Sequence, residues 1–75
     1  MNPTDFITWA LRGLRNAAQH RPNLFAQRRD LYIHTAQGHF GYQSPIVDEI
    51  DGQLPTSPAE SLGNVSDVET FPLPI

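Results

Sequence analysis

Aromatic residues and prolines divide this sequence into two unequal parts. Six of the seven aromatic residues lie at or before position 42, whereas five of the seven prolines lie in the last 31 residues. Large aromatic side chains supply much of a small core, and proline cannot donate a backbone hydrogen bond or continue a helix. Residues 45–75 therefore cannot build a core of their own, and we expect them to lie on the first part of the chain or on another protein.

The chain is short enough to form only one domain. Its 75 residues include no cysteine and are 39% apolar, below the roughly 45–50% of an average globular domain. Residues 1–44 carry five arginines and two aspartates, a net charge of +3, and residues 45–75 carry six acids and no base, a net charge of −6. We interpret the chain as a compact unit at 1–44 followed by an acidic, extended arm at 45–75. Such a polar molecule can dock on itself or on a charged partner.

The N-terminal segment has the signals of an amphipathic helix. Asn2 is a good N-cap, Pro3 suits the first helical position, and Pro22 disfavours helical backbone at the residue before it. We therefore expect a helix that ends near His20. Apolar side chains would cover an arc of about 200° on this helix, which is wider than one small hairpin can bury.

The apolar side of this predicted helix is a candidate interface. Its large members are anchors of the kind that dominate protein–protein contacts: Phe6, Trp9, Leu11 and Leu14. A row of small residues, Ala10, Gly13 and Ala17, would let another backbone approach closely. Burial in the core of the chain itself is the simpler interpretation of the same pattern.

The middle of the chain has the pattern of a β-hairpin. LYIHT is rich in β-branched and aromatic residues, AQG supplies a turn at Gly38, and HFGYQ would return as the second strand. We therefore pair Leu31–Thr35 with His39–Gln43, which together with the N-terminal helix predicts an α+β fold. A helix that continues to Gly38 is the alternative, but it would place Arg28 and Thr35 on an apolar face.

The acidic part contains two short helix starts and an extended end. Ser44–Pro45 and Ser57–Pro58 each place a capping serine before a first-turn proline, which predicts one or two helical turns in each case. From Val65 onward, the sequence VSDVETFPLPI contains two prolines and cannot form a helix. Its alternating apolar residues would bind in grooves of a partner while the backbone stays extended: Phe71, Leu73 and Ile75.

No motif in the sequence supports catalysis or a cofactor. The histidines, His20, His34 and His39, lack the spacing of a zinc site, and DEIDG at 48–52 lacks the ligand pattern of a calcium loop. The sequence has no glycine-rich phosphate loop and no nucleophile elbow, and a chain of this size would struggle to enclose a ligand pocket. We expect no enzyme activity, no cofactor and no bound metal.

Charge and hydropathy argue against nucleic acid and membrane as partners. Arg12, Arg15, Arg28 and Arg29 could form a basic face, but a pI of about 5.3 is low for a dedicated nucleic-acid binder. Arg12 and Arg15 also fit the ordinary polar face of an amphipathic helix, and we expect Arg28 and Arg29 to be exposed. The sequence has no run of about 18 apolar residues that could span a bilayer. Arginines interrupt the one candidate for a signal peptide, so synthesis in the cytosol is the expected default.

These features favour a non-enzymatic protein that docks in a larger assembly. Its partners would be one or more proteins, and other copies of this chain are among the candidates. The most concrete form of this hypothesis is a minor component of a virus particle, such as the capsid, neck or tail of a bacteriophage, located in the virion or in the cytoplasm. The alternative is a small inhibitor or regulator of one host protein, with an acidic part that imitates a nucleic-acid strand.

Overall fold

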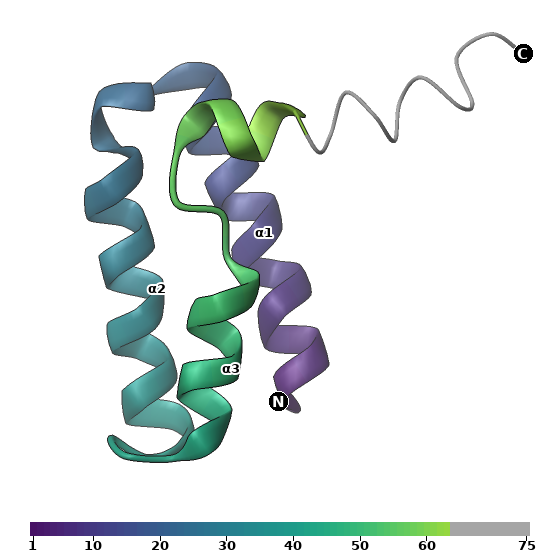
Figure 1. Ribbon diagram of the computed structural model, residues 1–75, viewed down its shortest axis with the longest axis vertical. Coiled ribbons are helices and arrows are strands. Elements are labelled where there is room, and N and C mark those ends of the chain that lie inside the picture. The colour runs from purple at the N-terminus through teal and green to yellow at the C-terminus, as the bar shows by residue number, and fades with distance from the viewer. Residues whose placement is uncertain (64–75) are drawn as a thin grey trace, which may run out of the picture.

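The computed structural model describes residues 1–63, and within that range the chain is helical and has no strand. Helix α1 spans Pro3–His20, a 3-10 turn η1 spans Pro22–Leu24, α2 spans Phe25–Phe40, and α3 spans Pro45–Gln53 (Figure 1). A further helical stretch covers residues 58–63. The predicted α+β fold is therefore wrong, and the described part of the chain has an all-α fold.

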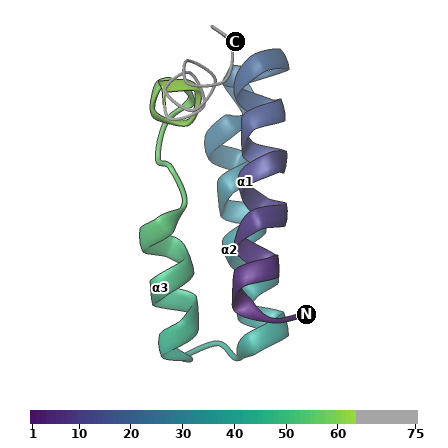
Figure 2. The ribbon, with the colours of Figure 1, turned by 90° about the vertical axis from the view of Figure 1, so that its right-hand side faces the viewer.

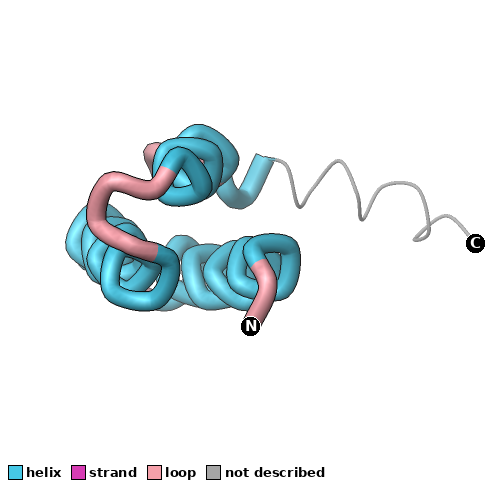
Figure 3. The backbone as a smooth tube through the Cα atoms, turned by 90° about the horizontal axis from the view of Figure 1, so that it is seen from below, coloured by secondary structure: helices cyan, strands magenta, loops and turns pink. Residues whose placement is uncertain are grey.

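The three α-helices run up, down and up again around a shared core. Helices α1 and α2 lie side by side and antiparallel, joined at one end by η1 (Figure 1). Helix α3 packs against both of them, and the three form a triangle when they are seen end-on (Figure 3). Figure 2 shows residues 58–63 at the end of the bundle where α1 stops and α2 starts. The chain thus returns to the α1–α2 junction after α3.

Local signals at both ends of α1 act as predicted. The Asn2 side chain accepts a hydrogen bond of 2.8 Å from the backbone N–H of Asp5. The helix ends at His20, because Arg21 leaves helical geometry immediately before Pro22. The predicted N-terminal helix is confirmed, and its boundaries follow from capping and proline chemistry.

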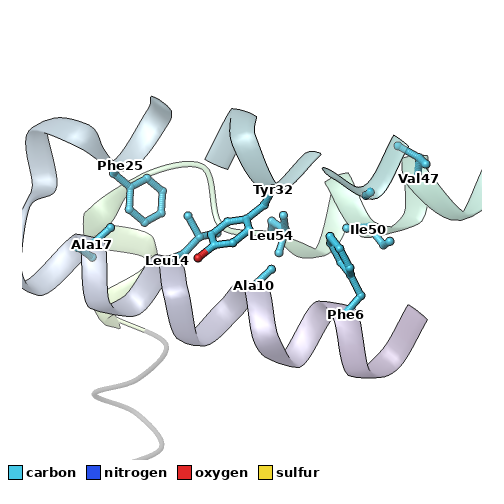
Figure 4. Close-up of a cluster of buried hydrophobic side chains, with 11 residues drawn as sticks. Phe6, Ala10, Leu14, Ala17, Phe25, Tyr32, Val47, Ile50 and Leu54 are labelled. Atoms are coloured by element: carbon cyan, nitrogen blue, oxygen red, sulfur yellow. The ribbon is translucent and has the colours of Figure 1, made fainter. Parts of the chain in front are cut away.

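The core lies between all three helices (Figure 4). Its buried apolar residues are Phe6, Ala10, Leu14, Ala17, Ala18, Phe25, Tyr32, Ala36, Val47, Ile50 and Leu54. The last three come from the part of the chain predicted as an arm, and they complete the core formed by α1 and α2. Each large apolar side chain buried in this way stabilises the fold by about 1.5–3 kcal/mol.

The predicted β-hairpin, with strands Leu31–Thr35 and His39–Gln43, is wrong. Residues 25–40 form the continuous helix α2, and the chain turns at Gly41, whose φ of 115° is a conformation that favours glycine. Gly38, expected in the turn, lies inside the helix with open space around it. The turn therefore comes later than expected and connects two helices instead of two strands.

Tertiary contacts explain why this segment is helical despite its β-branched and aromatic residues. Its buried residues recur at helical spacing: Phe25, Tyr32 and Ala36. One face of α2 can therefore pack against α1 and α3, which outweighs a modest strand propensity. Arg28 and Thr35, expected to obstruct such a face, lie beside it and are exposed. The Thr35 hydroxyl also donates a 2.8 Å hydrogen bond to the carbonyl of Leu31, one turn earlier.

Arg29 lies on the inner side of α2 and links it to the end of α3. Its Nε donates to the Pro55 carbonyl at 2.9 Å, and its Nη2 donates to the carbonyl and the carboxylate of Asp51 at 2.8 and 2.6 Å. Carbonyls in the last turn of a helix lack partners within the helix, so this guanidinium satisfies groups that α3 leaves open. Only 16% of the Arg29 side chain is exposed, so the expectation that Arg29 is exposed is wrong.

Both predicted Ser–Pro helix starts are confirmed. The Ser44 hydroxyl accepts from the Ile46 N–H at 3.2 Å, and α3 begins at Pro45. The Ser57 hydroxyl accepts from the Glu60 N–H at 3.2 Å, where residues 58–63 become helical. The arm residues predicted to bind a partner lie outside the described residues: Phe71, Leu73 and Ile75.

Candidate functional site

An open groove of about 400 Å³ lies between α1 and the first part of α2. Six of its lining residues define this α1/α2 groove: Trp9, Arg12, Gly13, Arg21, Arg28 and Tyr32. All of its lining comes from α1, the α1–α2 connection and α2, and α3 contributes none. The groove therefore uses surface that the core leaves free.

Tyr32 forms the floor of the groove by lying against Gly13. A β-carbon on Gly13 would be 1.7 Å from the Tyr32 hydroxyl oxygen, so the ring occupies space that any other side chain would need. Figure 4 shows the hydroxyl end of Tyr32 pointing toward α1. The row of small residues was predicted to admit another backbone, and at Gly13 a side chain of the same protein fills that space.

Trp9 forms one wall of the groove and is held in place by two other aromatic rings. Its ring centroid lies 4.9 Å from that of Tyr32 and 5.5 Å from that of Phe6, both in edge-to-face geometry. Trp9 is nevertheless 47% exposed. A large side chain that is both exposed and already ordered loses little conformational entropy when a partner covers it, which is the behaviour of a binding anchor.

Three arginines surround this aromatic wall, and all three are exposed: Arg12, Arg21 and Arg28. Within residues 1–63 none of them forms a salt bridge, and no carboxylate lines the groove. Guanidinium groups bind carboxylates and phosphates through paired hydrogen bonds and also stack on aromatic rings. The groove therefore favours a negatively charged ligand that carries apolar side chains.

A second hollow of about 580 Å³ continues from the groove across the outer face of α2. Leu24 and Arg28 line both hollows. The second one adds Leu31, whose side chain is 54% exposed, together with Asp30 and His34. Apolar surface is thus available on both sides of Arg28, from Trp9 at one end to Leu31 at the other.

The structure separates the predicted anchors of α1 into two groups. Phe6 and Leu14 are 2% and 0% exposed and pack inside the core of the chain. Trp9 and Leu11 are exposed, but only Trp9 lines the groove. Contact with a partner stays a prediction for all four. The wide apolar arc is thus buried at its centre by α2 and α3, and two large residues remain on the surface.

The sequence did not identify Arg21 and Tyr32 as site residues. It also suggested a set of arginines that differs from the set lining the groove. Arg29, which sequence alone could group in one basic face with Arg12, Arg15 and Arg28, pairs with Asp51 and does not line the groove. Arg21 lies in the connection between α1 and η1, where no periodicity indicates a direction. The sequence signals that did point to part of this site were Trp9 as a large residue of the predicted helix, Gly13 in its row of small residues, and Arg12 and Arg28 as cationic residues.

Comparison with protein-family models, with curated proteins and with solved structures finds no match to this chain.

The groove residues offer binding chemistry rather than a set of reactive groups. Among the lining residues there is no carboxylate, histidine, serine or cysteine. Nowhere in residues 1–63 do three metal-ligating side chains come together. None of the helices described in that range has the length and hydropathy needed to cross a membrane. The chemistry available at this site is charge pairing, hydrogen bonding and contact with aromatic rings.

Proposed function

We propose that this protein is a non-enzymatic interaction subunit that docks a protein partner of a larger assembly in the α1/α2 groove. The observation that carries this proposal is the state of Trp9, which is half exposed yet held by the rings of Phe6 and Tyr32. Most of the binding energy of a protein interface comes from a few such aromatic and arginine side chains. Here both kinds line the same groove.

The partner segment should carry carboxylates next to apolar side chains. Carboxylates would pair with the arginines of the groove, and an apolar side chain would cover Trp9 or Leu31. A protein segment fits this combination better than a nucleic acid, because the chain has a net charge of −3 and would repel a long polyanion outside the groove.

The concrete form of this proposal is a minor virion component, such as a bacteriophage capsid, neck or tail subunit, present in the virion or the cytoplasm. The alternative, an inhibitor that imitates nucleic acid through its acidic residues, has less support. Asp51, one of the acids that such an inhibitor would use, is already paired with Arg29. The two differ in copy number: a subunit stays with the purified particle in many copies, whereas an inhibitor forms a small soluble complex.

Recovery of variants with the native assembly tests the proposal. Trp9→Ala should reduce recovery with the assembly about tenfold or more, because it removes a central anchor. Tyr42→Ala is the matched control, since Tyr42 is 74% exposed and lies outside both hollows. Arg28→Glu should also reduce recovery, whereas Arg28→Lys, which keeps the charge, should reduce it less. Normal recovery of both Trp9→Ala and Arg28→Glu would show that docking uses another surface.

A further inference from the structure

The residues that follow the described part of the chain complement the charge of the α1/α2 groove. Residues 64–75 carry two carboxylates, Asp67 and Glu69, and no base. The groove carries three arginines that form no salt bridge within residues 1–63. We propose that residues 64–75 bind in the α1/α2 groove of their own chain, an inference that rests on the docking groove proposed above.

An extended backbone would present the acids and the apolar residues of this segment on one side. Successive side chains of an extended chain point to opposite sides, so every second residue faces the same way. The odd-numbered positions hold two acids followed by three apolar residues: Asp67, Glu69, Phe71, Leu73 and Ile75. The carboxylates on this side match the arginines of the groove, and the apolar residues match the exposed surfaces of Trp9 and Leu31.

The prolines of the segment lower the entropic cost of binding in this way. Pro72 and Pro74 each have a fixed φ, and each restricts the residue before it to extended conformations. They also lack an N–H, so neither leaves a backbone donor without a partner when the groove covers it. A segment with fewer free conformations loses less entropy when it becomes ordered.

The segment starts at the correct end of the molecule and is long enough to follow the groove. Residues 58–63 lie where α1 stops and α2 starts (Figures 1 and 2), and Arg21 and Leu24 line the groove near that junction. The 12 residues from 64 to 75 can span at most about 40 Å. The groove between Arg21 and Trp9 follows about 18 Å of helix. The excess length allows the chain to pass around the bundle before it enters the groove.

Attachment to the same chain favours this contact over the same contact from a second copy. A segment joined by a short connection has an effective concentration of about millimolar, which exceeds the concentration of free protein in most solutions. The segment would therefore act as a built-in competitor. A protein partner must displace it before docking in the groove, so the groove is regulated by the chain that carries it.

The test uses the full chain, with Trp9 as reporter because it is the only tryptophan. Nuclear magnetic resonance compares the Trp9 indole and the Gly13 amide in the native chain and in the double variant Asp67→Lys with Glu69→Lys. Both resonances should shift in this segment variant, because lysines opposite the arginines remove the segment from the groove. Unchanged resonances in the segment variant would overturn the proposal.

A matched control separates this effect from a general change in charge. Asp48→Lys with Glu49→Lys alters the net charge by the same amount at two exposed positions of α3 and should leave the Trp9 indole in place. Equal shifts in the two variants would overturn the proposal. A Trp9 resonance of the native chain that moves on about tenfold dilution would also overturn it, because contact within one chain does not depend on concentration.

A peptide of residues 64–75 distinguishes the failure of this proposal from the failure of the proposed function. The peptide should bind the segment variant about tenfold or more tightly than it binds the native chain, where the attached segment competes. Equal affinity for the two chains would overturn the intramolecular contact. The docking function is judged separately, by the recovery of Trp9→Ala with the native assembly.

Discussion

Tyr32 of α2 lies so close to Gly13 of α1 that a β-carbon on the glycine would be 1.7 Å from the hydroxyl oxygen and 2.6 Å from Cζ of the ring. Because Cζ of the ring overlaps with that position as well as the hydroxyl oxygen, only a shift of the whole ring would make room. The contact fixes how closely α1 and α2 approach each other, and it forms the floor of the groove at the same time.

We predict that Gly13→Ala destabilises the protein. Forcing a carbon into a packed site costs about 1–3 kcal/mol, and the better helix propensity of alanine returns about 1 kcal/mol. The net loss should be up to about 2 kcal/mol in urea unfolding followed by circular dichroism. Gly38→Ala is the matched control: Gly38 has open space around it in α2, so this change should be neutral or stabilising. A more stable Gly13→Ala chain would contradict the close contact.

Arg29 should stabilise the fold mainly through the carbonyls at the end of α3. Arg29→Met removes hydrogen bonds from a charged donor to the carbonyls of Asp51 and Pro55 and should cost about 2 kcal/mol. Asp51→Asn removes only the carboxylate charge at a side chain that is 52% exposed, so it should cost less than about 1 kcal/mol. Chemical unfolding of the two variants measures the difference. Equal losses would mean that the ion pair, and not the carbonyl contacts, carries the effect.

Trp9 and Phe6 should differ in what they contribute. Phe6→Ala empties a fully buried position and should cost about 3–5 kcal/mol of stability. Trp9→Ala removes two ring contacts at a half-exposed position and should cost about 1–2 kcal/mol. The binding free energy of the Trp9→Ala variant for a partner should nevertheless weaken by about 2 kcal/mol or more. Thermal unfolding and a binding measurement on each variant test this; equal stability losses would place Trp9 in the core.

A chain shortened after Gly63 should keep its helical circular dichroism, because the buried core of the described residues ends at Leu54 and the helices described all lie within residues 1–63. A partner that binds in the groove should bind this shortened chain more tightly, since the competing segment is gone. Loss of docking would instead indicate direct contact of the partner with Phe71, Leu73 and Ile75. Loss of the helical signal would mean that residues 64–75 are needed for folding.

The candidate site was only partly predictable from sequence. Trp9 stands out as a large residue on a helix, but its exposure depends on how far α2 and α3 cover the apolar arc. Arg12 and Arg28 are far apart along the chain, and they line the same groove only because α1 and α2 are antiparallel neighbours. Arg29, adjacent to Arg28, points toward α3 instead of the groove, because a step of one residue turns a helix by about 100°.

The sequence by itself determined where helices start and stop when capping residues and prolines were present. Asn2 marks the start of α1, Pro22 marks its end, and Ser44 marks the start of α3. Capping and the steric effect of proline act within one turn of backbone, so they can be recognised from sequence. Tertiary structure decided the rest. Residues 31–40 have the composition of strands, but as a helix they place Tyr32 and Ala36 against α1 and α3, and that burial outweighs a local preference of under about 1 kcal/mol per residue. Packing also decided which large apolar residues of α1 are buried and which are exposed. The exposure of a side chain depends on the helices packed around it, and the sequence of α1 alone does not specify those helices.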